Sequence, residues 1–189
     1  MLSLSKKSAL AITCAALLSS GASAWGEKKN PDVGGAAMYP TKTIVENAVN
    51  SKDHTTLVAA VKAAGLVDTL NSGGPFTVFA PTNAAFEALP AGTVDNLLKP
   101  ENKDMLTKVL TCHVVGADAM SDAIGKMIKD DGGTHPVKTV GGCTLQAKMD
   151  GDKITLTDEN GGVATVTIAD VDQSNGVIHV IDKVLLPKA

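Results

Sequence analysis

Four histidines and three cysteines are the side chains of this sequence best suited to metal or nucleophilic chemistry. The histidines are far apart along the chain, and none has a second ligand at a spacing typical of metal sites; they are His54, His113, His135 and His179. The sequence has no Gly-x-Ser-x-Gly, His-Glu-x-x-His or Cys-x-x-Cys motif and no glycine-rich phosphate loop. We therefore expect a protein that is not an enzyme and that uses no metal and no cofactor.

Two acidic clusters have a superficial likeness to calcium-binding loops. They are Asp150-Gly151-Asp152 and Asp158-Glu159-Asn160-Gly161. Neither has the alternating ligands and the closing Glu of an EF-hand. Asp-Gly and Asn-Gly are, in contrast, strong signals for tight hairpin turns. We interpret both clusters as solvated turns between strands.

The first 24 residues have the pattern of a signal peptide. Lys6 and Lys7 precede an apolar run over residues 9–18, and Ala22-Ser23-Ala24 suits signal peptidase. The apolar run is about half of the 20 or so residues that span a bilayer, which disfavours a membrane anchor. Lipidation at Cys14 is disfavoured because the residues before it do not fit a lipoprotein signal. We expect export, extracellular or periplasmic, and a mature protein that starts at Trp25 and is not inserted in the membrane.

Removal of Cys14 with the signal peptide leaves one pair of cysteines, Cys112 and Cys143. Exported proteins fold in an oxidising compartment, where an even number of cysteines usually forms disulfides. We predict a Cys112–Cys143 disulfide that ties the helical half of the chain to its strands. The alternative is two separate buried thiols, which behave as small apolar side chains.

The charge of the chain argues against nucleic-acid binding. All 17 basic residues are lysines, and the mature chain would have 15 of them against 20 acidic residues, a net charge of about −5. Arginine supplies the planar fork that grips phosphates and guanine edges, and it is absent. The few aromatic residues disfavour, without excluding, a site that stacks sugars on exposed rings.

The hydrophobic pattern changes from helical to strand-like along the chain. Residues 25–40 have no apolar period and are expected to form a flexible leader, with one domain over residues 41–187. Helices are predicted at 41–49, 53–64, 82–89, 93–98, 101–112 and 117–128. Strands are predicted at 76–79, 113–115, 137–140, 143–149, 153–157, 163–168 and 176–186. Helices in the first half and strands in the second indicate an α+β fold with a mostly antiparallel sheet.

Two blocks of the sequence resemble the signatures of the fasciclin (FAS1) family. They cover residues 76–86 and 175–187, in the order and at the separation of that family. The likeness extends over residues 41–187 and implies a wedge of β-strands flanked by helices, in a secreted or surface protein that mediates adhesion. The signature residues are Phe76, Pro81, Thr82, Asn83, Phe86, Gly176, His179 and Asp182.

The same resemblance indicates candidate binding residues. The Tyr-His motif of the family is matched by Cys112-His113, without the tyrosine, and its Asp-Ile motif by Asp170-Val171. Both pairs also have structural interpretations. His113 would bond at a helix-to-strand junction, and Asp170 would end a strand and cap the turn that follows.

Two functions remain open from the sequence. The first is an adhesion module that recognises a protein or glycan at the cell surface or in a matrix. The second is a periplasmic small-ligand carrier or sensor, because Met120 and Met127 lie on one face of the predicted 117–128 helix and suit an adaptable groove.

Overall fold

The structure is a computed structural model that describes residues 29–188, so the predicted signal peptide and residues 25–28 lie outside the described residues. The helices are α1 (Ile44–Ala48), α2 (Thr55–Ala64), α3 (Val67–Asn71), α4 (Asn83–Glu87), α5 (Thr93–Leu97), α6 (Lys103–Thr111) and α7 (Ser121–Asp130), with short 3-10 turns η1 (Lys52–His54) and η2 (Pro100–Asn102). The strands are β1 (Phe76–Pro81), β2 (Val114–Val115), β3 (His135–Lys138), β4 (Thr144–Asp150), β5 (Lys153–Thr157), β6 (Val163–Gln173) and β7 (Gly176–Ile181).

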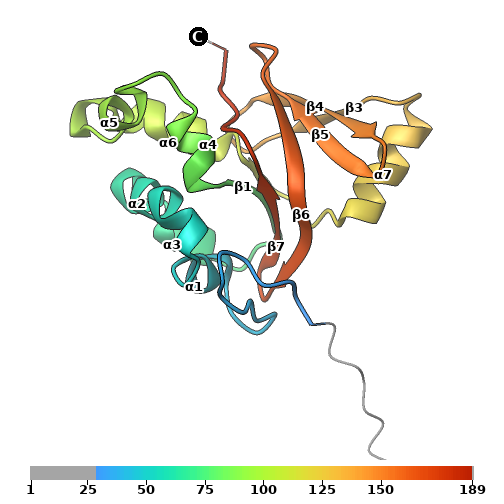
Figure 1. The fold of residues 1–189 in the computed structure, drawn as a ribbon, viewed down its shortest axis with the longest axis horizontal. Coiled ribbons are helices and arrows are strands. Elements are labelled where there is room, and N and C mark those ends of the chain that lie inside the picture. Colours follow the sequence, from blue (N-terminus) through green and yellow to red (C-terminus); the bar gives the residue numbers. More distant parts are fainter. Residues whose placement is uncertain (1–28, 189) are drawn as a thin grey trace, which may run out of the picture.

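The strands form one bent sheet with the order β2-β1-β7-β6-β5-β4-β3. Only β1 and β7 pair in parallel among the described strands, and the other neighbours are antiparallel. The long strand β6 shifts register twice against β7, where it passes from one half of the sheet to the other. Helices α1 to α6 lie beside β1 and β7, and α7 lies with β3 to β5 (Figure 1). The predicted α+β wedge is confirmed.

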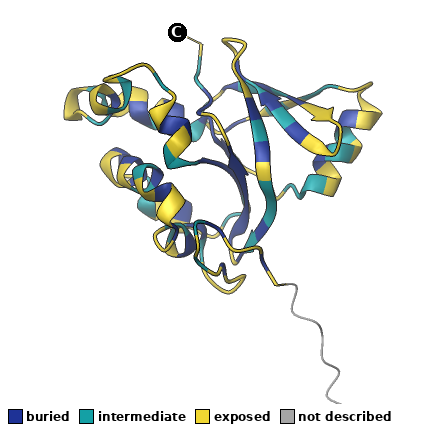
Figure 2. Ribbon diagram, in the orientation of Figure 1, coloured by how far each residue is buried: buried dark blue, intermediate teal, exposed yellow. Residues whose placement is uncertain are grey.

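Each half of the molecule has its own core, and the central strands contribute to both. Val78 and Ala80 of β1 pack among helices α1 to α6, whereas Phe79 between them faces the interior of the wedge. This alternation follows from the period of two in a strand. Figure 2 shows that β1 and β7 are buried while the outer helical surfaces are exposed. A strand buried on both faces explains the continuous apolar run in each signature block.

Local signals set some of the helix ends. Thr43 caps α1 in a reciprocal capping box with Glu46, so the cap lies two residues after the predicted Thr41. Gly65 ends α2 in the left-handed conformation, as predicted. The acidic clusters form the hairpin turns between β4 and β5 and between β5 and β6, as expected. Asp158, however, is buried and not solvated, because its carboxylate accepts from the N–H groups of Asn160, Gly162 and Leu186.

The described part of the predicted leader, residues 29–40, differs from the flexible segment that we expected. Asn30 exchanges two hydrogen bonds with the backbone of Asp172, of 2.6 and 2.9 Å. Val33 and Met38 are buried in the helical core. Two isolated apolar residues give no periodic signal in the sequence, but they are sufficient to hold this segment against the domain.

Candidate functional site

The two signature blocks are neighbouring strands at the centre of the sheet. β1 and β7 pair in parallel from Phe76 opposite Gly176 to Pro81 opposite Ile181. Gly176 has a φ of 148°, and a Cβ atom there would collide with the backbone of Phe76. Only glycine allows this close approach without strain. The signature therefore specifies how the strands pair.

Other signature residues connect the strands to the helices. Thr82 caps α4 by accepting a hydrogen bond from the Ala85 N–H. The Asn83 side chain accepts from the Thr56 N–H and donates to the Lys52 carbonyl, so it joins α4 to the start of α2. Phe86 is buried in the helical core. Asp182 accepts a 2.7 Å hydrogen bond from the Thr165 N–H and thereby extends the pairing of β6 with β7.

His113 is an interior residue and is only 2% exposed. Its Nδ1 lies 2.8 Å from the Val109 carbonyl, and its Nε2 accepts a 2.9 Å hydrogen bond from the Leu185 N–H. Burial lowers the pKa of His113 to about 4, against the opposing effects of the Val109 carbonyl and the Asp158 charge. The neutral ring thus joins the end of α6 to the C-terminal segment, and both of its nitrogens are engaged within the protein.

Cys112 and Cys143 form the predicted disulfide. Their Cα atoms are 5.4 Å apart, and both residues are buried. The bond fixes the end of α6 to the start of β4. Thr139 stabilises the backbone beside this disulfide, because its hydroxyl and its N–H form hydrogen bonds with the backbone of Cys143.

Asp170 and Val171 have different structural roles. Val171 is fully buried in the helical core, so the predicted binding role would need it to leave that core. The half-buried Asp170 has a φ of 57°, and its carboxylate accepts hydrogen bonds from the N–H and the hydroxyl of Ser121. It therefore caps α7 across 49 residues of sequence, a contact that the sequence did not suggest.

One group of neighbouring side chains consists of Ser121, Asp170 and His179. Its hydrogen bonds are not connected in the way that they are in a catalytic triad. The Ser121 hydroxyl bonds to the Asp170 carboxylate and not to a histidine. Nδ1 of His179 accepts from the Asp170 N–H at 3.2 Å, and its Nε2 lies 2.8 Å from the Ala119 carbonyl. Both ring nitrogens are thus engaged by the backbone, and the ring is fully buried against Phe79. The group holds the segment before α7 on the sheet.

We expect Asp170→Ala to lower the free energy of unfolding by about 1 to 2 kcal/mol, because α7 loses its cap. Alanine also tolerates a positive φ less well than aspartate. Urea denaturation monitored by circular dichroism measures the change. Asp170→Asn, which keeps one acceptor and suits the backbone conformation, should lose less. Unchanged stability together with lost partner binding would instead assign Asp170 a direct binding role.

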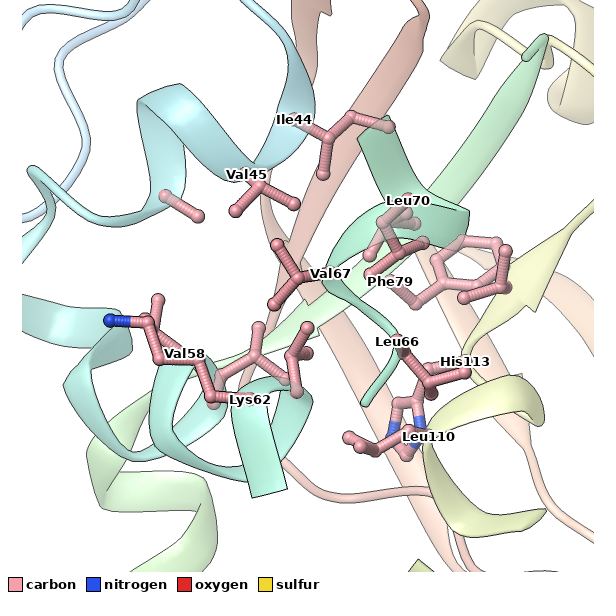
Figure 3. A pocket seen from close by; sticks show the side chains of 15 residues that line it. Ile44, Val45, Val58, Lys62, Leu66, Val67, Leu70, Phe79, Leu110 and His113 are labelled. Atoms are coloured by element: carbon pink, nitrogen blue, oxygen red, sulfur yellow. The ribbon is translucent and has the colours of Figure 1, made fainter. Parts of the chain in front are cut away.

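A narrow apolar opening lies in the helical layer, between α1, α2, α3 and α6 (Figure 3). We call it the helical pocket. Its free volume is about 40 Å³. Its outer wall consists of half-buried apolar residues and the stem of one exposed lysine, and His113 lies at its base. The outer residues are Val45, Val58, Lys62, Leu66 and Val67.

A wider opening, which we call the α7 cleft, lies between α7, β3 and the β1–β2 edge. Its volume is about 340 Å³. Met127 lines it, as expected for the predicted 117–128 helix, whereas Met120 is not part of its wall. The walls are Phe79, Val115, Ala117, Ile124, Met127 and Val137, with Thr77, Ala119, His135, Pro136 and Lys138 completing the cleft.

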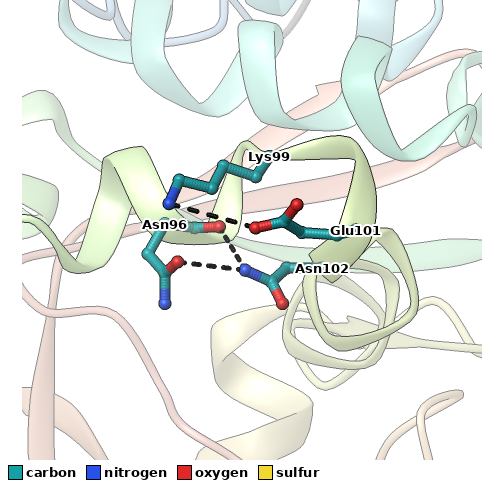
Figure 4. Close-up of polar contacts among 4 residues, drawn as sticks. All are labelled: Asn96, Lys99, Glu101 and Asn102. Carbon is teal, nitrogen blue, oxygen red and sulfur yellow. Dashed lines mark hydrogen bonds and ion pairs between the residues drawn. The ribbon is translucent and has the colours of Figure 1, made fainter.

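A polar cluster marks the turn between α5 and α6 (Figure 4). The Asn102 side chain donates to the carbonyl and the side-chain oxygen of Asn96, at 2.7 and 3.1 Å. Lys99 and Glu101 form an exposed ion pair of 4.0 Å, a kind that contributes little stability. These polar groups bond to one another, so we interpret the cluster as a local brace for the turn.

Among residues 29–188, no three His, Cys, Asp or Glu side chains gather as a metal site. Within the same described range, every helix is too short or too polar to cross a bilayer. We take the helical pocket and the α7 cleft, whose walls are mainly apolar, as the candidate binding sites.

Comparisons with known proteins agree on one family. The family model described as Fasciclin domain matches residues 52–187. Protein sll1483 of Synechocystis sp. (strain ATCC 27184 / PCC 6803 / Kazusa) is 50% identical over 160 residues, which cover 85% of this chain and 82% of that protein. A second relative is the cell surface glycolipoprotein MPB83 of Mycobacterium bovis (strain BCG / Tokyo 172 / ATCC 35737 / TMC 1019). It is 34% identical over a match that covers 96% of this chain and 77% of that protein.

A solved structure has the same fold at lower identity. The FAS1 domain pair of the insect cell adhesion molecule Fasciclin I superposes with a TM-score of 0.69 at 18% identity. The match covers 77% of this chain and 51% of that chain. At this identity the likeness concerns the fold alone.

Proposed function

The chain belongs to the fasciclin domain family, and from this premise we propose that it is an exported adhesion module that binds a protein at a cell surface or in a matrix. The family is known for adhesion and binding. The observation that carries the proposal is the helical pocket, an apolar opening in the outer layer of the domain.

The size of the helical pocket favours a protein partner over a glycan or a free small molecule. Ligand sites for small molecules usually measure about 300 to 1,000 Å³. The roughly 40 Å³ available here suit the end of one aliphatic side chain. Interfaces often concentrate their binding energy in such an anchor side chain, surrounded by contacts that exclude water. A glycan would instead need polar partners, which the apolar wall does not provide.

Export is part of the proposal. Its support is the signal-peptide pattern over residues 1–24 and the relative named as a cell surface glycolipoprotein. A single domain offers one anchor pocket, so strong adhesion would require several copies displayed together.

We expect Val58→Lys to abolish adhesion while the domain stays folded. Val58 is half-buried and lines the helical pocket, but unlike Val45 and Val67 it does not pack against the helical core. Lysine forms helices at least as well as valine, so the change mainly puts a charge at the anchor site. Beads coated with the mature protein, and their retention on cells or matrix, measure adhesion.

The matched control is Val163→Lys. Val163 is 43% exposed at the start of β6 and takes no part in the pocket. Both variants should keep the circular dichroism spectrum of the parent protein. Equal retention of parent, Val58→Lys and Val163→Lys beads would contradict adhesion through the helical pocket.

The α7 cleft favours a second candidate function, carriage or sensing of a small ligand. Its volume of about 340 Å³ falls within the usual range for small-molecule sites. Native mass spectrometry of the purified protein tests this candidate, and repeated absence of a bound small molecule would count against it.

A further inference from the structure

The α7 cleft has walls that suit an apolar ligand. Half-buried Val115, Met127 and Val137 provide apolar surface, and the almost fully buried Phe79 and Ile124 complete the wall. The Thr77 hydroxyl, the polar group inside, donates to the Ala117 carbonyl at 2.6 Å and accepts from the Ala119 N–H at 2.9 Å. Since the protein itself satisfies this hydroxyl, a ligand body in the cleft needs no polar groups of its own.

The ionisable side chains that line the cleft are basic. Lys138 and His135 both come from β3, and no acidic residue is part of the described lining. His135 is already engaged, because its Nδ1 lies 2.6 Å from the Asp131 carboxylate on the side of α7. Lys138 is exposed and is part of the lining, so it places a positive charge at the rim of the cleft, which favours an anionic group there.

The edge strand argues against an added peptide strand as the occupant. β3 is the last strand of the sheet, and Pro136 lies at its middle. Proline has no N–H to donate to an incoming strand, and its presence is a common protection of exposed edges. A compact molecule that fills the cleft fits these observations better than an extended chain.

We propose that the α7 cleft binds a small organic acid, with its apolar body between β1 and α7 and its carboxylate at Lys138. The volume of about 340 Å³ lies within the usual range for small-molecule sites. This proposal rests on the second candidate function, because it specifies the class of ligand that the α7 cleft would carry. It is independent of adhesion through the helical pocket.

The test is an NMR titration of the full mature chain with 3-phenylpropanoate, and with 3-phenyl-1-propanol as its uncharged analogue. Both should shift the methyl signals of Met127 and Ile124, with saturation in about the millimolar range or below for the acid. The acid should bind more tightly than the alcohol. Shifts that do not saturate, shifts outside the cleft, or equal affinities for acid and alcohol would overturn the proposal.

Three variants test whether binding takes place in the α7 cleft and depends on Lys138. Ala117→Leu fills the cleft from an exposed position and should abolish binding of both compounds. Lys138→Gln should weaken the acid about two- to fivefold, the effect of one exposed ion pair, and leave the alcohol unchanged. Lys126→Gln, an exposed lysine on α7 that lines a different hollow, should change neither affinity.

The outcome is separable from that of the adhesion experiment, because the titration contains no partner. If the Ala117→Leu variant no longer binds the acid while beads coated with it still adhere, two separate sites are confirmed. Equal weakening by Lys138→Gln and Lys126→Gln would show nonspecific charge attraction and would overturn the assigned site.

Discussion

Acidification from pH 6.5 to 4 should lower the free energy of unfolding by about 3 kcal/mol through His113 alone. Burial lowers the pKa of this histidine to about 4 in the folded protein, whereas an unfolded chain has the ordinary value near 6.5. Each unit of difference corresponds to about 1.4 kcal/mol between the two protonation states. Hydrogen bonding adds to the cost, because protonated Nε2 can no longer accept from the Leu185 N–H.

The sign follows from the depressed pKa. Between pH 6.5 and 4 the unfolded chain binds the proton and the folded chain does not, so stability rises with pH in this window. The contribution of His113 is complete above pH 6.5 and is lost as the pH falls through the folded pKa. Burial also lowers the pKa of His54 and His179, so both act in the same direction.

Urea denaturation at half-unit pH steps measures this dependence. The range from pH 6.5 to 5 is the most informative, because carboxylates with lowered pKa, such as Glu46 and Glu159, contribute only at more acid pH. His113→Gln should be less stable at pH 7 and should have a shallower slope in this range. A flat profile from pH 6.5 to 5 in the parent protein would show that these histidines are not buried in neutral form.

Reduction of the Cys112–Cys143 disulfide should cost roughly 3 to 4 kcal/mol at most. The bond joins residues 31 positions apart, and this figure is the chain entropy that such a loop removes from the unfolded state. The effect should appear as a lower urea midpoint after reduction under denaturing conditions and blocking of the thiols. Because His113 directly follows Cys112 after the end of α6, loss of the bond should also loosen the C-terminal segment that His113 holds.

Thiol titration of the denatured mature protein provides the direct check. No reactive thiol before reduction and two afterwards, at a monomeric mass, are the expected result. The double variant Cys112→Ala with Cys143→Ala separates the covalent bond from the chemistry of reduction, and it should be destabilised to a similar degree. Two reactive thiols before reduction would contradict the bond.

Much of the fold follows from local patterns in the sequence. The change of the hydrophobic period from 3.6 to two residues predicted the α+β class, and Asp-Gly and Asn-Gly predicted the hairpin turns. Gly65 ended a helix where predicted, because a glycine accepts the left-handed conformation. The single pair of cysteines gave the disulfide. The ends of α1, β6 and β7 were less accurate, since tertiary packing and not propensity sets them.

The candidate sites depended on contacts between distant parts of the chain. Asp170 looked like the cap of its own turn, but it caps α7, which the fold brings beside it. Val171 and His113 were candidate binding residues from the family resemblance, and only the structure shows that both are buried. The helical pocket joins residues from four helices and two strands, so no sequence window contains its pattern.

The sequence alone thus determined the fold class, the family resemblance, the disulfide and the expectation of export, because each depends on residue types and their spacing. Only the tertiary structure decided which polar residues are interior braces and where open apolar surface remains. The physical reason is that burial and hydrogen-bond partnership are properties of atoms brought together from remote segments. His179 illustrates this: its partners, Ala119 and Asp170, lie 60 and 9 residues away in the sequence.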